Sequence, residues 1–169
     1  MTLNMSWVPR ITITPVITAT PTISAATYSA GQQLGGIMTL SPAVRQDGQT
    51  SGGSCELASV TILDKAAQSS KMDIWFFNVS PTLVSSDHAT FNITDANLVA
   101  QCIGVVSVGV TYSASSANSV SSTTNLNLPL NIAQTSATPT SVFAVAVCQG
   151  TPTYTSTSDL QFQFGFYVD

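Results

Sequence analysis

This sequence has very few charged residues. Lys, Arg, Asp and Glu together make up 7% of the 169 residues, whereas about 25% is usual for a globular domain. Apolar residues make up 44%, which is a normal share, so the chain has enough apolar surface to form a core. Ser, Thr, Asn and Gln take the place of the missing ions. We therefore predict a folded domain whose surface carries hydroxyl and amide groups.

Three other features are missing, and each argues against a class of function. The net charge is −4 and no basic stripe is present, which argues against nucleic-acid binding. No apolar run approaches the length of a membrane span, so we expect no membrane partner. The N-terminus lacks the basic start, apolar stretch and cleavage site of a secretory signal. We expect synthesis in a cytoplasm without export by the general secretion route.

The chain has three cysteines, Cys55, Cys102 and Cys148, which lie far apart in the sequence. An odd number in a chain without a secretory signal does not favour a disulfide framework. No CxxC pair is present, so the spacing does not favour zinc either. We interpret all three as small buried apolar residues and expect no metal and no cofactor.

Residues that could carry catalysis are scarce. The single histidine, His88, follows Asp87 in a polar segment, and neighbouring side chains of an extended chain diverge, so the two are poorly placed to orient one another. No GxSxG motif occurs, and Glu56 is the only glutamate. The remaining aspartates are scattered at expected turns and strand ends, where Asp normally caps or turns the chain. We predict that the protein is not an enzyme and has no catalytic residues.

Alternation of apolar and polar residues predicts an all-β fold. The last segment shows it best, because Leu160, Phe162, Phe164 and Phe166 alternate with polar residues or glycine. Thr94 followed by Asp95 is the one convincing helix start, for a helix to about Cys102. We predict strands at 34–40, 56–63, 72–79, 103–112, 125–132, 142–148 and 160–168, and loops at 43–54, 80–90 and 113–122. This spacing of strands favours an antiparallel sandwich of the jelly-roll type with one short helix.

Residues 1–26 differ from the rest, and we predict an extended N-terminal arm ahead of a β-sandwich domain at 27–169. Prolines recur at positions 9, 15 and 21, which excludes a central strand but allows extended chain along an edge or over another surface. The apolar residues between the prolines favour burial away from water. We therefore expect the arm to leave the sandwich and lie along a neighbouring subunit or along the surface of another protein assembly. The candidate contact residues in the arm are Trp7, Ile11, Ile13, Val16 and Ile17.

The segment Met72–Val79 (MDIWFFNV) is apolar on both faces. Two interpretations follow. Either both faces are covered within the sandwich and its loops, or one face meets a neighbouring subunit, since a sandwich strand normally buries one face. The second interpretation adds Trp75 and Phe77 to the candidate contact residues and favours an oligomer, most simply a trimer.

Five stretches carry a resemblance to known proteins. They are TYSAGQQLGGIMTL (27–40), SGGSCELASVTILDKAAQSSKMDIWFF (51–77), FNITDANLVAQCIGVVSV (91–108), NLNLPLNI (125–132) and VCQGTPTYTSTSDLQFQFGFYVD (147–169). Together they resemble a family of small proteins encoded beside capsid genes in tailed phages and prophages. Such proteins are taken as head decoration, or cement, proteins with a jelly-roll-like fold.

The resemblance implies a structural protein on the exterior of a phage capsid, made in the bacterial cytoplasm. Its partners would be the major capsid protein and further copies of itself, and the family pattern supplies no catalytic residue. The alternative is a tail- or spike-associated module that binds host glycans. Such a module shares the fold and the Ser/Thr-rich surface but needs a pocket with an exposed aromatic ring and several polar groups.

Overall fold

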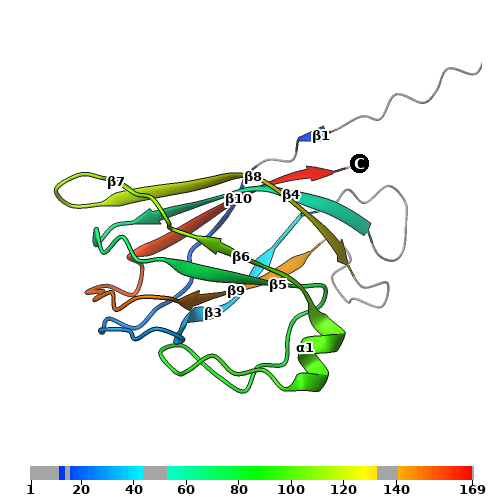
Figure 1. Ribbon diagram of the computed structural model, residues 1–169, viewed down its shortest axis with the longest axis horizontal. Helices are drawn as coiled ribbons and strands as arrows, with labels where there is room; N and C mark the ends of the chain where they lie inside the picture. The colour runs from blue at the N-terminus through cyan, green and yellow to red at the C-terminus, as the bar shows by residue number, and fades with distance from the viewer. Residues whose placement is uncertain (1–11, 14–15, 44–52, 133–140, 169) are drawn as a thin grey trace, which may run out of the picture.

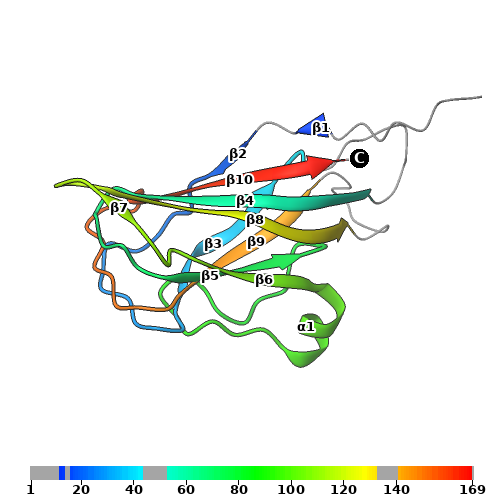
Figure 2. The same cartoon turned by 45° about the horizontal axis from the view of Figure 1, so that its top comes forward.

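The chain folds as an all-β sandwich of two antiparallel sheets with one short helix, as the alternation predicts (Figures 1 and 2). The computed structural model describes residues 12–13, 16–43, 53–132 and 141–168. The elements are β1 (Thr12–Ile13), β2 (Ile17–Ala19), β3 (Gln33–Leu40), β4 (Gly53–Asp64), β5 (Met72–Phe77), α1 (Asp95–Gln101), β6 (Cys102–Val108), β7 (Ser113–Ala114), β8 (Ser119–Ile132), β9 (Val142–Cys148) and β10 (Leu160–Val168).

The strands follow the order of a jelly roll. One sheet has the order β1-β10-β4-β8-β7, with β2 also on β10, and the other has the order β3-β9-β5-β6. The chain is a long hairpin rolled up on itself, because β5 pairs with β6, β4 with β8, β3 with β9 and β2 with β10. The predicted jelly-roll-like sandwich is therefore confirmed.

The main core lies between the two sheets. β10 directs Phe162, Phe164 and Phe166 inward, and all three side chains are buried. From the opposite sheet, the ring of Phe76 on β5 meets Phe164 edge-on, with 6.1 Å between the ring centroids. Burying a side chain of this size stabilises a fold by about 1.5–3 kcal/mol relative to leaving it exposed. The alternating aromatic face of the last strand therefore holds the two sheets together.

Helix α1 begins where the sequence predicts. The Oγ1 atom of Thr94 accepts a hydrogen bond from the amide of Asn97 at 3.3 Å, and Asp95 places a negative charge in the first turn. The helix ends because the chain becomes extended at Cys102, with φ −75° and ψ 130°, and continues directly into β6.

The structure corrects the prediction for the N-terminal arm. β2 pairs with Phe162–Phe164 of β10, and Ile23 is buried in the main core. β1 pairs with Tyr167 and Val168, nearer the end of β10. Prolines exclude a central strand, but an edge strand uses one side of its backbone, so the segments between prolines can still pair. The hypothesis that the arm leaves its own sandwich therefore fails for residues 12–13 and 17–26, while residues 1–11 and 14–15 lie outside the described residues.

The structure also corrects the predicted loop at 113–122. Residues 113–114 form β7, and β8 already begins at Ser119. The two are joined by a tight turn, in which the amide of Ser115 donates to the carbonyl of Asn118 at 2.7 Å. A Ser-rich composition favours a loop, but Ser119 and Ser121 face the interior and are buried. Cross-strand pairing with β4 outweighs the local composition here.

The strand predicted at 103–112 ends early, at Val108. The next residue, Gly109, has φ +74°, and a Cβ atom at this position would lie 2.8 Å from the carbonyl oxygen of Ser70. The backbone turns away from β5 at a position where only glycine is tolerated.

Candidate interaction surface

The outer face of the four-stranded sheet is apolar, and a long connection covers part of it. We call this connection, residues 78–94 between β5 and α1, the strap. Phe77 on β5 and Phe143 and Val145 on β9 point to this face and are buried. Three partly buried side chains of the strap pack against them: Leu83, Phe91 and Ile93. Of the two interpretations of the doubly apolar strand, cover by the chain's own loop therefore accounts for Phe77.

One carboxylate fastens the strap to the rest of the domain. Oδ1 of Asp87 accepts hydrogen bonds from the hydroxyl of Tyr28 at 2.7 Å and the amide of Gly35 at 2.5 Å. Oδ2 accepts from the hydroxyl of Ser24 at 2.6 Å. Burial, together with the bond to Asp87, raises the pKa of Tyr28 above its usual value. We call Ser24, Tyr28, Gly35 and Asp87 the Asp87 latch, because it joins the strap to β3 and to the segment before it.

His88 does not take part in the Asp87 latch and contacts Thr27 instead. Its Nε2 atom lies 3.0 Å from the carbonyl oxygen of Thr27. A carbonyl only accepts, so this nitrogen carries the hydrogen. The ring also meets Tyr28 edge-on, with 4.8 Å between centroids. The arrangement holds the strap against the chain ahead of β3.

Other acidic side chains also hold loops in place. Asp64 accepts from two backbone amides of the loop that follows β4, and Asp159 accepts from two amides just ahead of it. Asp73 accepts from the hydroxyl of Ser107 on the neighbouring strand at 2.5 Å. Within the described residues, no group of three or more His, Cys, Asp and Glu side chains is arranged to hold a metal ion.

The three cysteines are free. Cys55 and Cys148 are buried, as predicted, whereas Cys102 is only half-buried at the start of β6. Burial raises the pKa of the Cys55 thiol to about 12 and also raises the pKa of Cys102. A thiol with a raised pKa is a weak nucleophile at neutral pH.

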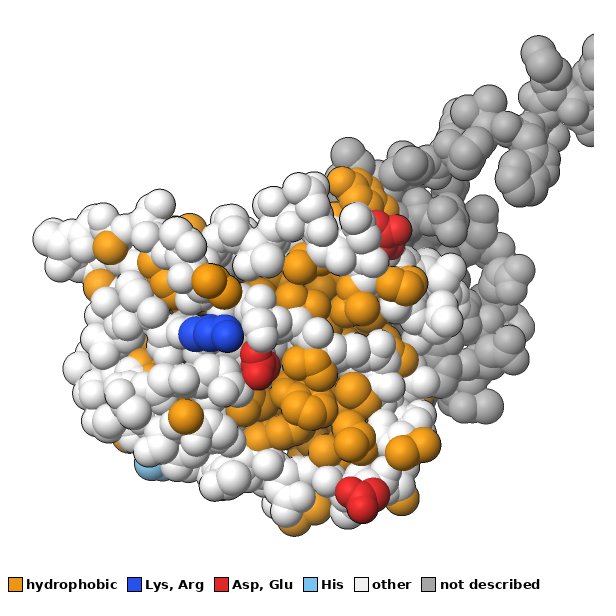
Figure 3. All heavy atoms as spheres, viewed as in Figure 1, with side chains coloured by type: hydrophobic (Ala, Val, Ile, Leu, Met, Phe, Trp, Pro, Cys, Tyr) orange, Lys and Arg blue, Asp and Glu red, His pale blue; other side chains and the backbone are white. Residues whose placement is uncertain are grey.

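The surface best suited to a partner lies around β6. On the outer face, Val105 is the cross-strand neighbour of Trp75, whose ring lies 5.0 Å from that of Phe91. On the side toward the other sheet, Leu126 and Leu128 of β8 are only partly buried. Figure 3 shows hydrophobic side chains gathered over this region. We call Trp75, Phe91, Val105, Leu126 and Leu128, with the edge of β6 between them, the β6 surface.

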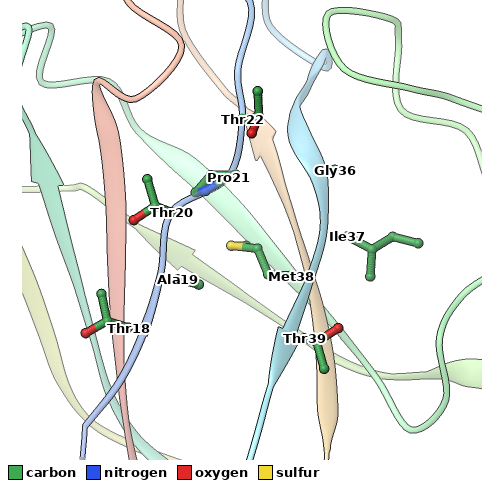
Figure 4. A pocket seen from close by; sticks show the side chains of 9 residues that line it. All are labelled: Thr18, Ala19, Thr20, Pro21, Thr22, Gly36, Ile37, Met38 and Thr39. Carbon is green, nitrogen blue, oxygen red and sulfur yellow. The ribbon is translucent and has the colours of Figure 1, made fainter.

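Two grooves elsewhere are lined mainly by polar groups. One, of about 380 Å³, lies between β2 and β3 and is lined by Thr18, Thr20, Thr22 and Thr39 together with Gly36 and Ile37 (Figure 4). The second, of about 280 Å³, is lined by the loops 68–71 and 149–152. Neither lining contains an aromatic ring, which a glycan pocket would be expected to offer.

The structure separates the residues predicted as a contact set. Trp75 belongs to the β6 surface, whereas Phe77 lies buried under the strap. Val16 is exposed next to β2, and Ile17 packs partly against the core, on the edge opposite β6. Ile13 lies in β1, paired with Tyr167. Trp7 and Ile11 lie outside the described residues.

Sequence reasoning missed both the latch and most of the β6 surface. Ser24 and Gly35 are far from Asp87 in the chain, and no motif relates them. Val105, Leu126 and Leu128 lie in predicted strands, but their position at an open side depends on the order of strands in the two sheets. One signal was present: Leu126 and Leu128 alternate with polar residues in a predicted strand that contains Pro129, and proline within a strand favours the edge of a sheet.

Comparisons with family models, curated proteins and solved structures found no match. In the part of the chain that the structure describes, no helix is long and apolar enough to cross a membrane.

Proposed function

We propose that the chain is a structural virion protein that binds the outer surface of a phage capsid and stabilises it, as a decoration or cement protein. The observation that carries the proposal is the β6 surface, an uncharged strand edge bordered by partly exposed apolar side chains. Such a surface suits contact with another protein, because apolar groups supply burial and a free edge supplies hydrogen bonds. The jelly roll and the resemblance of residues 27–169 to decoration proteins support the same proposal.

The chemistry of the described residues is consistent with attachment. A decoration protein adds contacts to a shell and needs a rigid shape, which the Asp87 latch and the loop-capping aspartates provide. The low charge also matters. A contact surface with few charged side chains has little charge to desolvate on binding, and salt screens its interactions only weakly. A protein that binds the assembled shell and not its free subunits stabilises the shell by mass action. Its partners are the major capsid protein and other copies of the chain, most simply in a trimer.

The proposal is tested by adding the purified chain to undecorated capsids assembled from the major capsid protein of the same phage genome. We expect saturable co-sedimentation and capsids that withstand higher temperature before they disrupt. Val105→Asp, which puts a charge on the β6 surface, should lower the occupancy. Val99→Asp is the matched control, since Val99 is 85% exposed on α1, outside that surface.

Two results would overturn the proposal. One is a chain that stays in the supernatant at concentrations well above those of the capsid subunits. The other is binding to host glycans on an array combined with no binding to capsids, which would favour the tail- or spike-associated alternative.

A further inference from the structure

The hydroxyl of Tyr154 is buried in the main core without a hydrogen-bond partner among the described residues. The residue is 1% exposed, and its ring packs edge-on against Tyr28, with 5.9 Å between the ring centroids. Its backbone amide donates to the carbonyl of Ala26 at 3.0 Å, so the main chain is also held in place. A hydroxyl taken out of water without a new hydrogen bond destabilises a fold, and native proteins rarely leave one in that state.

The surroundings of this hydroxyl are polar, although the ring lies in the core. Burial raises the pKa of Tyr154, and the negative charge of Asp64 is the largest further cause. Burial and then Asp64 raise the pKa of Tyr112 in the same way, and the hydroxyl of Tyr112 donates to the carbonyl of Ser70 at 2.6 Å. The two tyrosine hydroxyls therefore lie around one carboxylate, at the end of β4.

Asp64 can accept more hydrogen bonds than the protein supplies. Its side chain is buried, with Oδ1 accepting from the amide of Ala66 at 3.0 Å and Oδ2 accepting from the amide of Ser69 at 2.8 Å. An ionised carboxylate has about four positions for donors, so these two bonds use about half of them. A buried charge is stabilised when its remaining positions are also hydrogen-bonded.

The side chains that could neutralise or coordinate this carboxylate are engaged elsewhere. Of the two lysines, Lys65 donates to the carbonyl of Ser158 at 3.0 Å, and Lys71 is exposed. No group of three or more His, Cys, Asp and Glu side chains in the described ranges is arranged to hold a metal ion. The missing partner must accept from the hydroxyl of Tyr154 and donate to Asp64, and water does both.

A route from solvent reaches the same end of the sandwich. The groove of about 280 Å³ is lined by Ser70 and Gly150, among others. The hydroxyl of Ser70 lies 3.6 Å from the Sγ atom of Cys148, a neighbour whose charge also acts on Tyr154. A Cβ atom on Gly150 would lie 2.8 Å from the Ser70 hydroxyl, so the wall of the groove is thin at this point.

We propose that Tyr154 and Asp64 bind a water molecule between them, which accepts from the hydroxyl and donates to the carboxylate. Its second hydrogen goes to the hydroxyl oxygen of Tyr112, giving the three hydrogen bonds that a buried water typically makes. Asp64 ends β4 of the six-stranded sheet, while Tyr112 and Tyr154 follow β6 and β9 of the four-stranded sheet. The water thus connects the two sheets at this end of the core. The site is independent of the proposed capsid contact.

Tyr154→Phe tests the site, because it removes the hydroxyl and keeps the ring. Loss of the bound water leaves Asp64 with fewer donors, so the equilibrium constant for unfolding in urea should rise about fivefold to tenfold. A hydroxyl with no partner at all predicts the reverse, since its removal would leave the chain as stable as the wild type or more stable. Tyr167→Phe is the matched control, because Tyr167 is 41% exposed on β10. Its unfolding constant should stay within about twofold of the wild type.

A crystal structure of the full-length wild type, at a resolution that places individual waters, gives a second measurement that does not depend on a variant. We expect a water about 2.6–3.0 Å from the hydroxyl oxygen of Tyr154 and within hydrogen-bond distance of Asp64. Three results would overturn the proposal: no water within about 3.5 Å of that oxygen, a direct bond from the hydroxyl to Asp64, or a Tyr154→Phe variant at least as stable as the wild type. None of them bears on capsid attachment.

Discussion

The two outer faces of the sandwich differ in polarity and in what covers them. The outer face of the six-stranded sheet is polar and open to water, with Thr61 on β4 bonded to Ser122 on β8 at 2.9 Å. The outer face of the four-stranded sheet is apolar, and the strap buries Phe77, Phe143 and Val145 beneath it. A strand that is apolar on both faces thus indicates a third layer of structure outside the sheet, which here is the strap. One residue of the strap, Phe91, also belongs to the β6 surface.

Phe77→Ala should have the largest effect on stability, because this side chain is completely buried although it lies outside the main core. We expect a loss of about 3–5 kcal/mol, as for Phe164→Ala in the main core. Urea unfolding of both variants makes the comparison. A loss below about 1 kcal/mol for Phe77→Ala would mean that the strap does not act as a core layer.

Asp87→Ala should have the second-largest effect. We expect it to lower the free energy of unfolding by about 2–4 kcal/mol, because three donors lose a charged acceptor. Asp87→Asn should lose less, since one amide oxygen can still accept. Asp95→Asn is the control for removing a carboxylate, as Asp95 is exposed in the first turn of α1. An Asp87→Ala variant as stable as Asp95→Asn would show that the latch does not fasten the strap.

Alkaline pH should destabilise the fold through its main core. Burial raises the pKa of Cys55 from 9.0 to about 12 and also raises the pKa of Tyr112 and Tyr154. The folded state then holds protons that the unfolded chain has released, so stability is complete below about pH 9 and falls as pH rises toward 12. Cys55 alone contributes a slope of up to about 1.4 kcal/mol per pH unit. Unfolding of Cys55→Ala at pH 8 to 11 should show a shallower slope than the wild type, and an equal slope would contradict the assignment.

Thr61→Val should have the smallest effect, within about 0.5 kcal/mol, because Thr61 is on the polar face and its bond to Ser122 is exposed to water. Thermal unfolding of the Thr61→Val variant and of the wild type under the same conditions measures this difference. A loss as large as that of Asp87→Ala would mean that the polar face is also covered.

The sequence predicts the sandwich well, because alternation in β10 and the double apolar pattern of β5 and β9 directly reflect which faces are buried. It also predicts the start of α1, since the cap at Thr94 is a local feature. Cover of β5 by the chain's own loops was one of the two interpretations of the sequence, but the sequence does not identify the strap as the covering segment, because Leu83, Phe91 and Ile93 are dispersed among polar residues. The Asp87 latch and the open edge of β6 depend on which strands become neighbours, and that long-range information is not contained in any local pattern.

The most direct test of the proposed function is to image virions at a resolution that distinguishes this sandwich from the shell beneath it. The account predicts density of the size and shape of the jelly roll at symmetry-related positions over the outside of the capsid. Density for the chain only at the tail or its fibres, with a bare capsid surface, would contradict it.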